Sequence, residues 1–326
     1  MKLATVKNYQ SPSSRDGKLV VVSSDGKRAL DAPSSFGSLI NALEDWSNAQ
    51  IVLKNLSQQL NNSDVGYELN SSDILAPLPR TYAWLDGSAF IQHVILVRKA
   101  RGAEPPEDLY DVPLMYQGVS DTLLSATADI PLIDESFGMD FEGEIAVVVD
   151  DVPMGTKANK AKDHIKLLLL MNDVSLRNLI PRELATGFGF FHGKPASSFA
   201  PFAVTPDQIG DAWIDCRVHL PLESWLNGKK YGNPNAAEMH FSFADLIEHA
   251  CKTRHLSAGT IIGSGTVSNK DESVGSSCLA EKRMLEKINT GSITTPFMKV
   301  GDRIEMEMFH NGSTVFGRIN QKVVQY

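Results

Sequence analysis

The chain has 326 residues, of which 42% are hydrophobic and 21% charged, and its formal net charge is −8 at pH 7. This length can bury a large core, and we expect a small domain followed by a larger one. No apolar run is long enough to cross a bilayer, no signal peptide opens the chain and the basic residues are scattered, so we expect a cytoplasmic protein that binds neither membranes nor nucleic acids.

Short strands and turns, followed by a helix, are predicted for the N-terminal part. Residues 19–23 have the pattern of a strand that ends in a turn at 24–26, and residues 38–60 have the pattern of a helix. Pro77 and Pro79 then interrupt regular pairing and favour extended backbone. We therefore place the domain boundary here, with a small accessory domain at 1–74 and the working domain at 75–326.

Strands dominate the second domain. Asn227-Gly228 and Asn311-Gly312 lie between runs with strand periodicity, and Asn-Gly is a strong hairpin signal because both residues tolerate positive φ. Helices are predicted near 158–164 and 243–253, the second with Ser242 as its cap. The balance predicts a β-rich α+β fold, and no βαβ series indicates a Rossmann sheet.

An acidic strand is the most informative segment. In residues 141–149, the alternation of a strand places Glu142 and Glu144 on one face and the larger apolar side chains on the other. The simplest alternative is a solvated face of an edge strand, since carboxylates are mostly exposed. Ala146 and Val148 share the face of the two glutamates, which argues against a fully solvated face.

A second apolar run, residues 165–171, ends at Asn172 and Asp173. Asp173 could complete an oxygen-rich cage with the two glutamates, and such a cage suits a hard cation such as magnesium, calcium or manganese. Alternatively, Asp173 caps a following helical turn. The three cysteines, Cys216, Cys251 and Cys278, lack CxxC spacing and indicate neither a disulfide framework nor a thiolate zinc site.

Several spaced motifs together resemble the fumarylacetoacetate hydrolase family. In chain order they are Glu142-x-Glu144, Met171-Asn172-Asp173-x-Ser175-x-Arg177, Gly193-Lys194-Pro195-x-x-Ser198-Phe199 and Gly263-Ser264-Gly265-Thr266. The resemblance covers residues 75–326. It implies a mixed β-sandwich roll of the fumarylacetoacetase C-terminal type, preceded by a small SH3-like β domain, and a homodimer.

The resemblance also implies a role for each matching residue. The metal ligands would be Glu142, Glu144, Asp173 and, as a further candidate, Asp86. Magnesium is the expected ion, with calcium or manganese as alternatives. The catalytic residues would be His93, which activates water, Glu281, which orients His93, and the oxyanion-stabilising cations Arg177 and Lys194. The substrate contacts would be Tyr116, Thr266 and one or more of Arg98, Lys99 and Arg101.

The sequence departs from the family pattern at a few positions. Ile180 stands where a third oxyanion donor, a glutamine, is expected. Ser88 and Leu184 replace two substrate-binding tyrosines. Ile95 and Leu96 occupy positions where many smaller members carry the glutamate that assists the histidine, which leaves Glu281 as its partner.

The expected activity is metal-dependent hydrolysis of a carbon–carbon bond in a β-diketo acid, either fumarylacetoacetate or an acylpyruvate from aromatic-compound catabolism. Water would be the nucleophile, because no serine or cysteine motif indicates a covalent intermediate. A second interpretation is a metal-dependent enzyme that catalyses decarboxylation, isomerisation or hydration of a 2-oxo dicarboxylic acid. A third is a non-catalytic metal- or ligand-binding protein.

Overall fold

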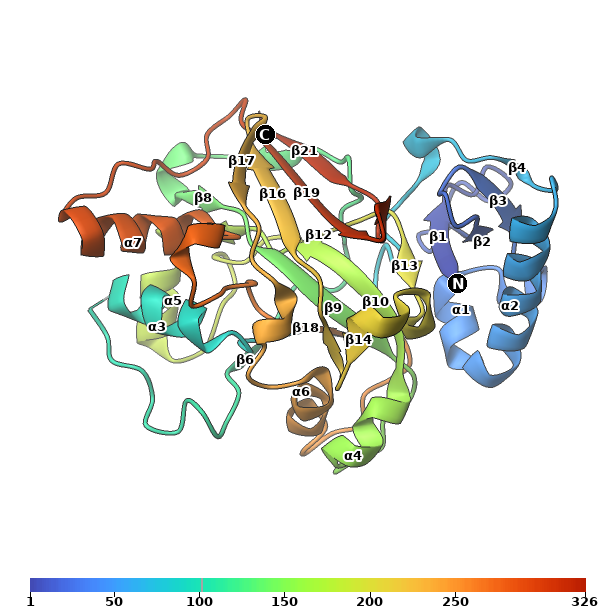
Figure 1. The fold of residues 1–326 in the computed structure, drawn as a ribbon, viewed down its shortest axis with the longest axis horizontal. Coiled ribbons are helices and arrows are strands. Elements are labelled where there is room, and N and C mark those ends of the chain that lie inside the picture. Colours follow the sequence, from blue (N-terminus) through green and yellow to red (C-terminus); the bar gives the residue numbers. More distant parts are fainter. Residues whose placement is uncertain (101) are drawn as a thin grey trace.

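The computed structural model describes residues 1–100 and 102–326 (Figure 1). The N-terminal part contains β1 (Lys2–Val6), β2 (Lys18–Val22), β3 (Arg28–Asp31), α1 (Leu39–Glu44), α2 (Trp46–Asn62) and β4 (Tyr67–Glu68). Next come β5 (Trp84–Gly87), α3 (Ile91–Ala100), β6 (Met115–Gln117), β7 (Ile130–Leu132), β8 (Met139–Asp140), β9 (Gly143–Val149), α4 (Ala158–Ala161), β10 (Ile165–Asn172), β11 (Ser175–Leu176) and α5 (Ile180–Thr186). The chain continues through β12 (Ser198–Phe199), β13 (Ala203–Val204), β14 (Trp213–Ile214), β15 (Arg217–Val218), β16 (Leu222–Leu226), β17 (Lys229–Gly232), α6 (Phe243–Ala250), β18 (Ile261–Gly263), α7 (Leu279–Thr290), β19 (Arg303–His310), β20 (Ser313–Thr314) and β21 (Ile319–Gln325).

Two sheets form the body of the molecule. The larger has the order β4-β3-β2-β1-β13-β10-β9-β18-β5-β6, with β12 beside β10, and the smaller has the order β17-β16-β19-β21-β7, with β20 beside β19. Most pairs are antiparallel, whereas β18 with β5 and β21 with β7 are parallel. The predicted β-rich α+β class is therefore confirmed. Within the described residues, no helix is both long and apolar enough to span a membrane.

Strand β9 lies in the middle of the larger sheet and is buried on both faces. Ile145, Val147 and Val149 belong to a core that also contains side chains of the smaller sheet, while Ala146 and Val148 pack into a second core on the opposite face. The alternation predicted for this segment is confirmed. Glu144 is on the face of Ala146 and Val148, and it is fully buried.

The predicted hairpins and caps are present. Asn227 and Gly228 have φ values of 52° and 74° and join β16 to β17, and Asn311 and Gly312, at 50° and 77°, join β19 to β20. These positive φ values explain the Asn-Gly pairs. Helix α6 begins after Ser242, which forms a capping box with Asp245, and ends at Ala250, somewhat earlier than predicted.

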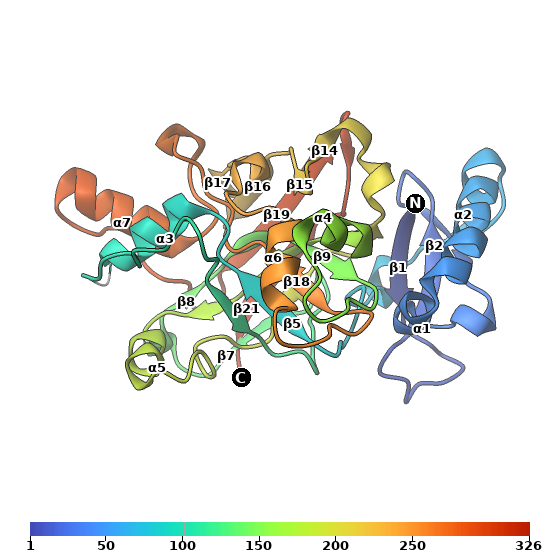
Figure 2. The ribbon, with the colours of Figure 1, turned by 90° about the horizontal axis from the view of Figure 1, so that it is seen from below.

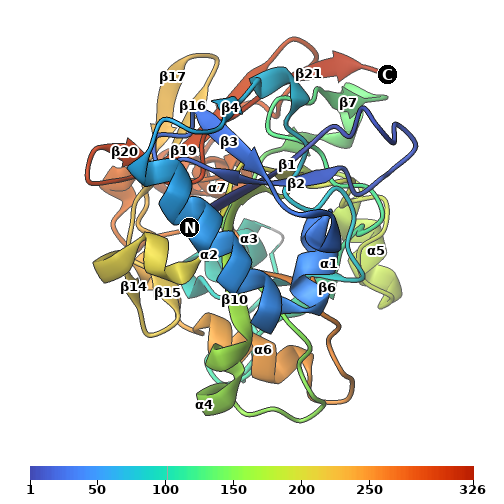
Figure 3. The same cartoon turned by 90° about the vertical axis from the view of Figure 1, so that its right-hand side faces the viewer.

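The N-terminal strands extend the main sheet. Strand β1 pairs antiparallel with β13, so that β1 to β4 continue the sheet of the second part, and α1 and α2 cover one of their faces (Figure 3). Leu3, Leu19, Leu43 and Leu53 are buried in the same core as Ala146 and Val148 of β9, so the N-terminal part shares this core with the second part of the chain. The residues in which we predict catalytic roles all lie outside the N-terminal part.

Removing residues 1–73 is expected to impair stability or assembly more than chemistry, because the deletion exposes the edge of β13 while it leaves the predicted site residues in place. Thermal unfolding, size-exclusion chromatography and turnover per folded molecule would check this. A truncated chain that stayed folded and dimeric yet lost all turnover would show instead that the N-terminal part contributes to the site.

Candidate active site

Four neighbouring strands of the main sheet, β10, β9, β18 and β5, bring three of the predicted acids together. Asp173 follows the last residue of β10, and its backbone N–H donates to the Glu142 carbonyl at 2.9 Å. Glu144 lies on β9, and Asp86 lies on β5, two strands away across β18. The close approach requires glycines in β18 and the loop after it: a Cβ on Gly263 would lie 2.4 Å from Asp86 Oδ1, and Gly265, at φ 76°, donates its N–H to the same oxygen at 3.0 Å.

Asp86, Glu144 and Asp173 form a buried cluster of carboxylates. One oxygen from each lies within 4.8 Å of the others. Neither oxygen of Glu144 meets a hydrogen-bond donor in the described part of the chain. Burial and the neighbouring carboxylates raise the pKa of both Asp86 and Glu144 well above the usual range. Glu144, with two unpaired oxygens, thus lies beside two further carboxylates, and an oxygen-rich set of this kind suits a hard divalent cation, so these residues fit such an ion.

Asp173 is the most highly connected acid of this cluster. Its Oδ2 accepts from the Tyr116 hydroxyl and from Lys194 Nζ, both at 2.6 Å. Its Oδ1 accepts from the Ser197 hydroxyl at 2.8 Å, and that hydroxyl in turn accepts from the indole N–H of Trp84 at 3.2 Å. The Asp173 carboxylate is therefore fixed in direction by three donors, one of them a cation.

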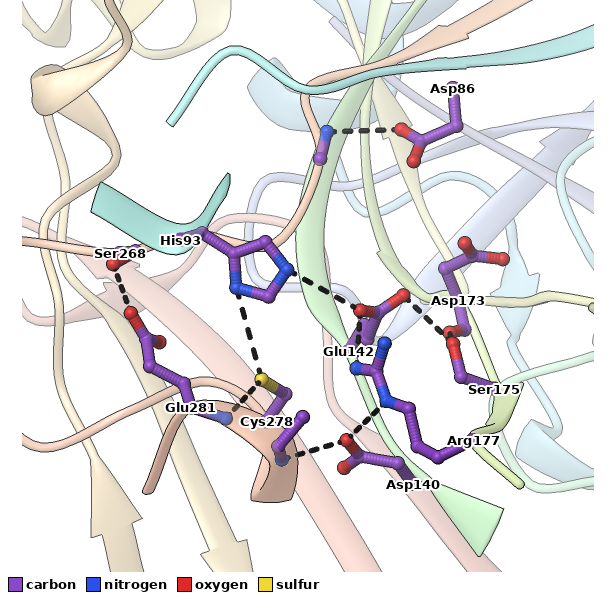
Figure 4. Close-up of polar contacts among 12 residues, drawn as sticks. Asp86, His93, Asp140, Glu142, Asp173, Ser175, Arg177, Ser268, Cys278 and Glu281 are labelled. Atoms are coloured by element: carbon purple, nitrogen blue, oxygen red, sulfur yellow. Dashed lines mark hydrogen bonds and ion pairs between the residues drawn. The ribbon is translucent and has the colours of Figure 1, made fainter. Parts of the chain in front are cut away.

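Glu142 lies beside the cluster but has cationic partners. Arg177 Nη2 is 2.6 Å from its Oε1, and the Ser175 hydroxyl donates to its Oε2 at 3.0 Å (Figure 4). Lys194 Nζ also donates to Oε2. Burial alone would raise the pKa of Glu142, but Arg177 and Lys194 hold it well below its usual range. Its role as a metal ligand remains a prediction, since these donors occupy its oxygens.

Asp140 links Arg177 to a helix terminus. Its carboxylate is fully buried, accepts Arg177 Nε at 2.8 Å and also accepts the backbone N–H groups of Leu279 and Ala280 at 2.6 and 2.9 Å. Unpaired N–H groups at the start of a helix favour a carboxylate in this position. Asp140 therefore holds the first turn of α7, the helix that carries Glu281.

His93, Cys278 and Glu281 form a second cluster, where α3 packs against α7 (Figure 2). His93 Nδ1 is 4.0 Å from the Cys278 sulfur, and His93 Nε2 is 3.7 Å from Glu142 Oε1. Glu281 Oε1 accepts a hydrogen bond from the Ser268 hydroxyl. Burial raises the pKa of the Cys278 thiol and raises that of Glu281 to about 7. The predicted histidine and glutamate are thus close together, with a thiol between their helices.

Glu281 is expected to make stability depend on pH. Because its pKa is raised in the folded protein, the protonated Glu281 carboxyl contributes to the free energy of unfolding. This contribution is fully present below its ordinary pKa of 4.5 and is lost as pH rises through about 7. Without metal, the free energy of unfolding would be measured by urea titration at about pH 5 and about pH 8. The loss of stability between these two pH values should be smaller in Glu281→Gln than in wild type by roughly 2 kcal/mol. An unchanged pH dependence in the variant would contradict the raised pKa.

The predicted substrate contacts are only partly brought together. Tyr116 reaches Asp173, and Thr266 is buried with a hydroxyl that has no partner among residues 1–100 and 102–326. Arg98 is in the last turn of α3 and donates to the Glu104 carbonyl at 3.3 Å. Arg101 lies outside the described residues. These four roles remain predictions.

Some site residues were not predicted. Asp140 could have been found, because Asp140, Glu142 and Glu144 recur at every second residue and so share a face of one extended segment. Ser197 and Cys278 carry no local signal, since their positions depend on long-range packing. Ile180, which replaces the expected glutamine, is buried at the start of α5.

The main sheet carries buried carboxylates beside a histidine and a lysine, an arrangement that fits a metal-dependent enzyme, and the sequence comparisons give the family. Residues 82–324 match the model described as Fumarylacetoacetate (FAA) hydrolase C-terminal, and residues 1–80 match Fumarylacetoacetase N-terminal domain 2. The chain belongs to the fumarylacetoacetate hydrolase family.

Proteins of similar sequence carry the names of different activities. Oxaloacetate tautomerase YisK of Bacillus subtilis is 25% identical over 302 residues, which cover 89% of each chain. Fumarylacetoacetase of Oryza sativa subsp. japonica is 25% identical over 251 residues, covering 63% of this chain and 58% of that protein.

Solved structures share the fold. Maleylpyruvate hydrolase from Sphingobium sp. SYK-6, in complex with manganese(II) ion and pyruvate, has a TM-score of 0.64 at 16% identity and covers 100% of this chain and 99% of its own. A 5-carboxymethyl-2-hydroxymuconate delta-isomerase from Mycobacterium smegmatis has a TM-score of 0.61 at 17% identity, with coverage of 100% and 99%. Hydrolases and isomerases therefore share this architecture.

Proposed function

We propose that the protein is a metal-dependent hydrolase that cleaves a carbon–carbon bond in a β-diketo acid, namely fumarylacetoacetate or an acylpyruvate. The observation that carries the proposal is the position of His93 and Glu281, which lie near each other and next to the carboxylates of the main sheet. Hydrolysis requires a base that can take a proton from water close to a polarised carbonyl group, and this arrangement provides one.

Asp86, Glu144 and Asp173 would hold the divalent ion, with Glu142 as a further predicted ligand. We propose magnesium, with calcium or manganese as alternatives. When bound, the ion supplies Lewis-acid polarisation of the substrate oxygens. Tyr116 and Lys194 fix the direction of the Asp173 carboxylate, so the acid is preorganised before any ligand arrives.

In the proposed reaction, His93 takes a proton from water while the water oxygen bonds to the acyl carbonyl carbon. Glu281 orients the imidazole and stabilises its protonated form. Lys194, which is only 7% exposed, stabilises the negative charge that develops on the carbonyl oxygen. The carbon–carbon bond then breaks, and the departing carbon takes up a proton. The products are a carboxylic acid that contains the water oxygen and a shortened oxo acid.

Tautomerisation of an oxaloacetate-like acid is the second candidate. Arg177 already contacts Asp140 and Glu142, and Lys194 contacts Glu142 and Asp173. Ile180 is apolar, so each of the three expected oxyanion donors is either engaged with a carboxylate or missing. A tautomerase needs only proton transfer between carbon and oxygen. The oxaloacetate tautomerase that matches along most of the chain supports this alternative.

Turnover in ¹⁸O-labelled water distinguishes the two reactions. The metal-reconstituted protein would be assayed with fumarylacetoacetate, a small panel of acylpyruvates and oxaloacetate. Hydrolysis should place one ¹⁸O atom in the carboxylic acid product and release the oxo acid in equal amount. Conversion of enol to keto oxaloacetate without cleavage of any β-diketo acid would replace the hydrolase proposal by the tautomerase. We also propose a homodimer, which sedimentation velocity would test.

A further inference from the structure

The cluster of His93, Cys278 and Glu281 contains three kinds of metal-ligating atom. A ring nitrogen, a thiol sulfur and a carboxylate oxygen all lie within 4.8 Å of one another. A tetrahedral zinc ion, with about 2.3 Å to sulfur and about 2.0–2.1 Å to nitrogen, separates these two ligands by about 3.6 Å. The observed distance between His93 Nδ1 and Cys278 Sγ is 4.0 Å, so a small side-chain adjustment would suffice.

Glu281 gives an independent indication that this cluster binds an ion. Its side chain is 3% exposed, and its Oε2 has no hydrogen-bond partner in the regions that the structure describes. A buried carboxylate oxygen without a donor is costly, and in native structures it commonly faces a bound ion or an ordered water. Here the unpaired oxygen belongs to the residue that shares the cluster with the thiol and the imidazole.

Two of the candidate ligands, His93 and Glu281, have the supporting polar contacts that metal-ligating side chains commonly have. The second ring nitrogen of His93 faces Glu142 Oε1 at 3.7 Å, and the other oxygen of Glu281 accepts from the Ser268 hydroxyl. A ligating histidine commonly has a carboxylate at its other nitrogen, and ligating carboxylates are themselves hydrogen-bonded. The cluster therefore has both the ligands and their supporting contacts.

We propose that His93, Cys278 and Glu281 bind a thiophilic divalent ion such as Zn²⁺, separately from the carboxylate cluster of Asp86, Glu144 and Asp173. Thiolate and imidazole favour zinc over magnesium, whereas carboxylates alone suit magnesium. On binding, the Cys278 thiol loses its proton to solvent. The ion engages the imidazole and the carboxylate that we assign to water activation, so occupancy inhibits turnover. This second consequence rests on the proposed function, whereas the binding itself does not.

Cobalt(II) is a suitable probe, because a cobalt–thiolate bond absorbs in the near ultraviolet and a cobalt ion held by carboxylates does not. The wild-type protein would be saturated with magnesium and titrated with Co²⁺ and, by calorimetry, with Zn²⁺. The matched control is Cys278→Ser. Cys278 Sγ accepts the Glu281 N–H at 3.4 Å as the N-cap of α7, and serine is a good N-cap, so this variant keeps the helix while it removes the thiolate.

We expect one equivalent of Co²⁺ to produce the thiolate band in wild type and no band in Cys278→Ser, with zinc affinity reduced by more than about tenfold in the variant. Zinc should inhibit wild type more strongly than Cys278→Ser, each compared with its own zinc-free rate. A missing band, or equal zinc affinity in the two proteins, would overturn the site. A band without any detectable turnover would support the site while contradicting the proposed function.

Discussion

Replacing Glu144 or Asp173 with alanine is expected to abolish both divalent-ion binding and turnover while the fold survives. Each residue contributes an oxygen to the buried cluster, and neither oxygen of Glu144 has a donor among the described residues that could substitute for an ion. Calorimetry with magnesium and manganese would measure binding, and thermal unfolding with and without ion would measure the stabilisation that binding provides.

The same measurements on the ion-free proteins give a second readout. Burial beside other carboxylates raises the pKa of Glu144, which means that its charged form is disfavoured in the folded protein. Glu144→Gln should therefore unfold at a higher temperature than wild type in a metal chelator, yet gain nothing from added ion. Wild-type ion affinity in the Glu144 and Asp173 variants would show that the cluster is not the metal site.

Glu142→Ala examines the fourth predicted ligand separately. If Glu142 binds the ion, this variant should lose affinity as the other two do. Unchanged affinity would restrict the ligand set to Asp86, Glu144 and Asp173, and would leave Glu142 as the counter-ion of Arg177 and Lys194.

His93→Ala is expected to reduce turnover by about two to four orders of magnitude, the usual contribution of a general base. Glu281→Gln should also reduce turnover severely, and combining the two should cost hardly more than His93→Ala alone, because an orienting residue has no effect once its base is removed. Magnesium affinity should change little in all three variants, since both residues lie in the cluster apart from the three carboxylates.

Two outcomes would contradict this pairing. Fully additive losses in the double variant would indicate separate roles for His93 and Glu281. Near-normal turnover in Glu281→Gln would show that another group orients His93. Calorimetric ion affinity serves as the control in each case, because it separates a loss of chemistry from a loss of the metal.

The fold was predictable where hydrophobic alternation or turn residues in the sequence determine the local structure. The alternation along β9, residues 143–149 of the predicted strand 141–149, and the Asn-Gly turns depend on neighbours in the sequence, and both are confirmed. The buried acids were predictable in part for the same reason, since Glu142 and Glu144 lie on one extended segment and Asp173 follows the adjacent strand.

Other parts of the site depend on contacts between distant segments. Lys194 is in a loop whose sequence alone indicates a solvated turn, and it is buried only because Glu142 and Asp173 accept its ammonium group. Cys278 is close to His93 because α3 packs against α7, across 185 positions of sequence. No local periodicity encodes such an arrangement. The resemblance to a family was therefore needed to select His93 from the eight histidines.

The hydrogen bonds from Trp84 through Ser197 to Asp173 should make the intrinsic fluorescence of Trp84 sensitive to ion binding at the carboxylate cluster. The Trp84 indole is completely buried and donates to the same hydroxyl that holds Asp173. An ion that neutralises Asp173 changes the electric field along this contact, and the emission of an indole responds to its local field. The other three tryptophans, Trp46, Trp213 and Trp225, lie elsewhere in the fold. With these replaced by phenylalanine, fluorescence from Trp84 would follow occupancy of the carboxylate cluster in real time, without a coloured substrate.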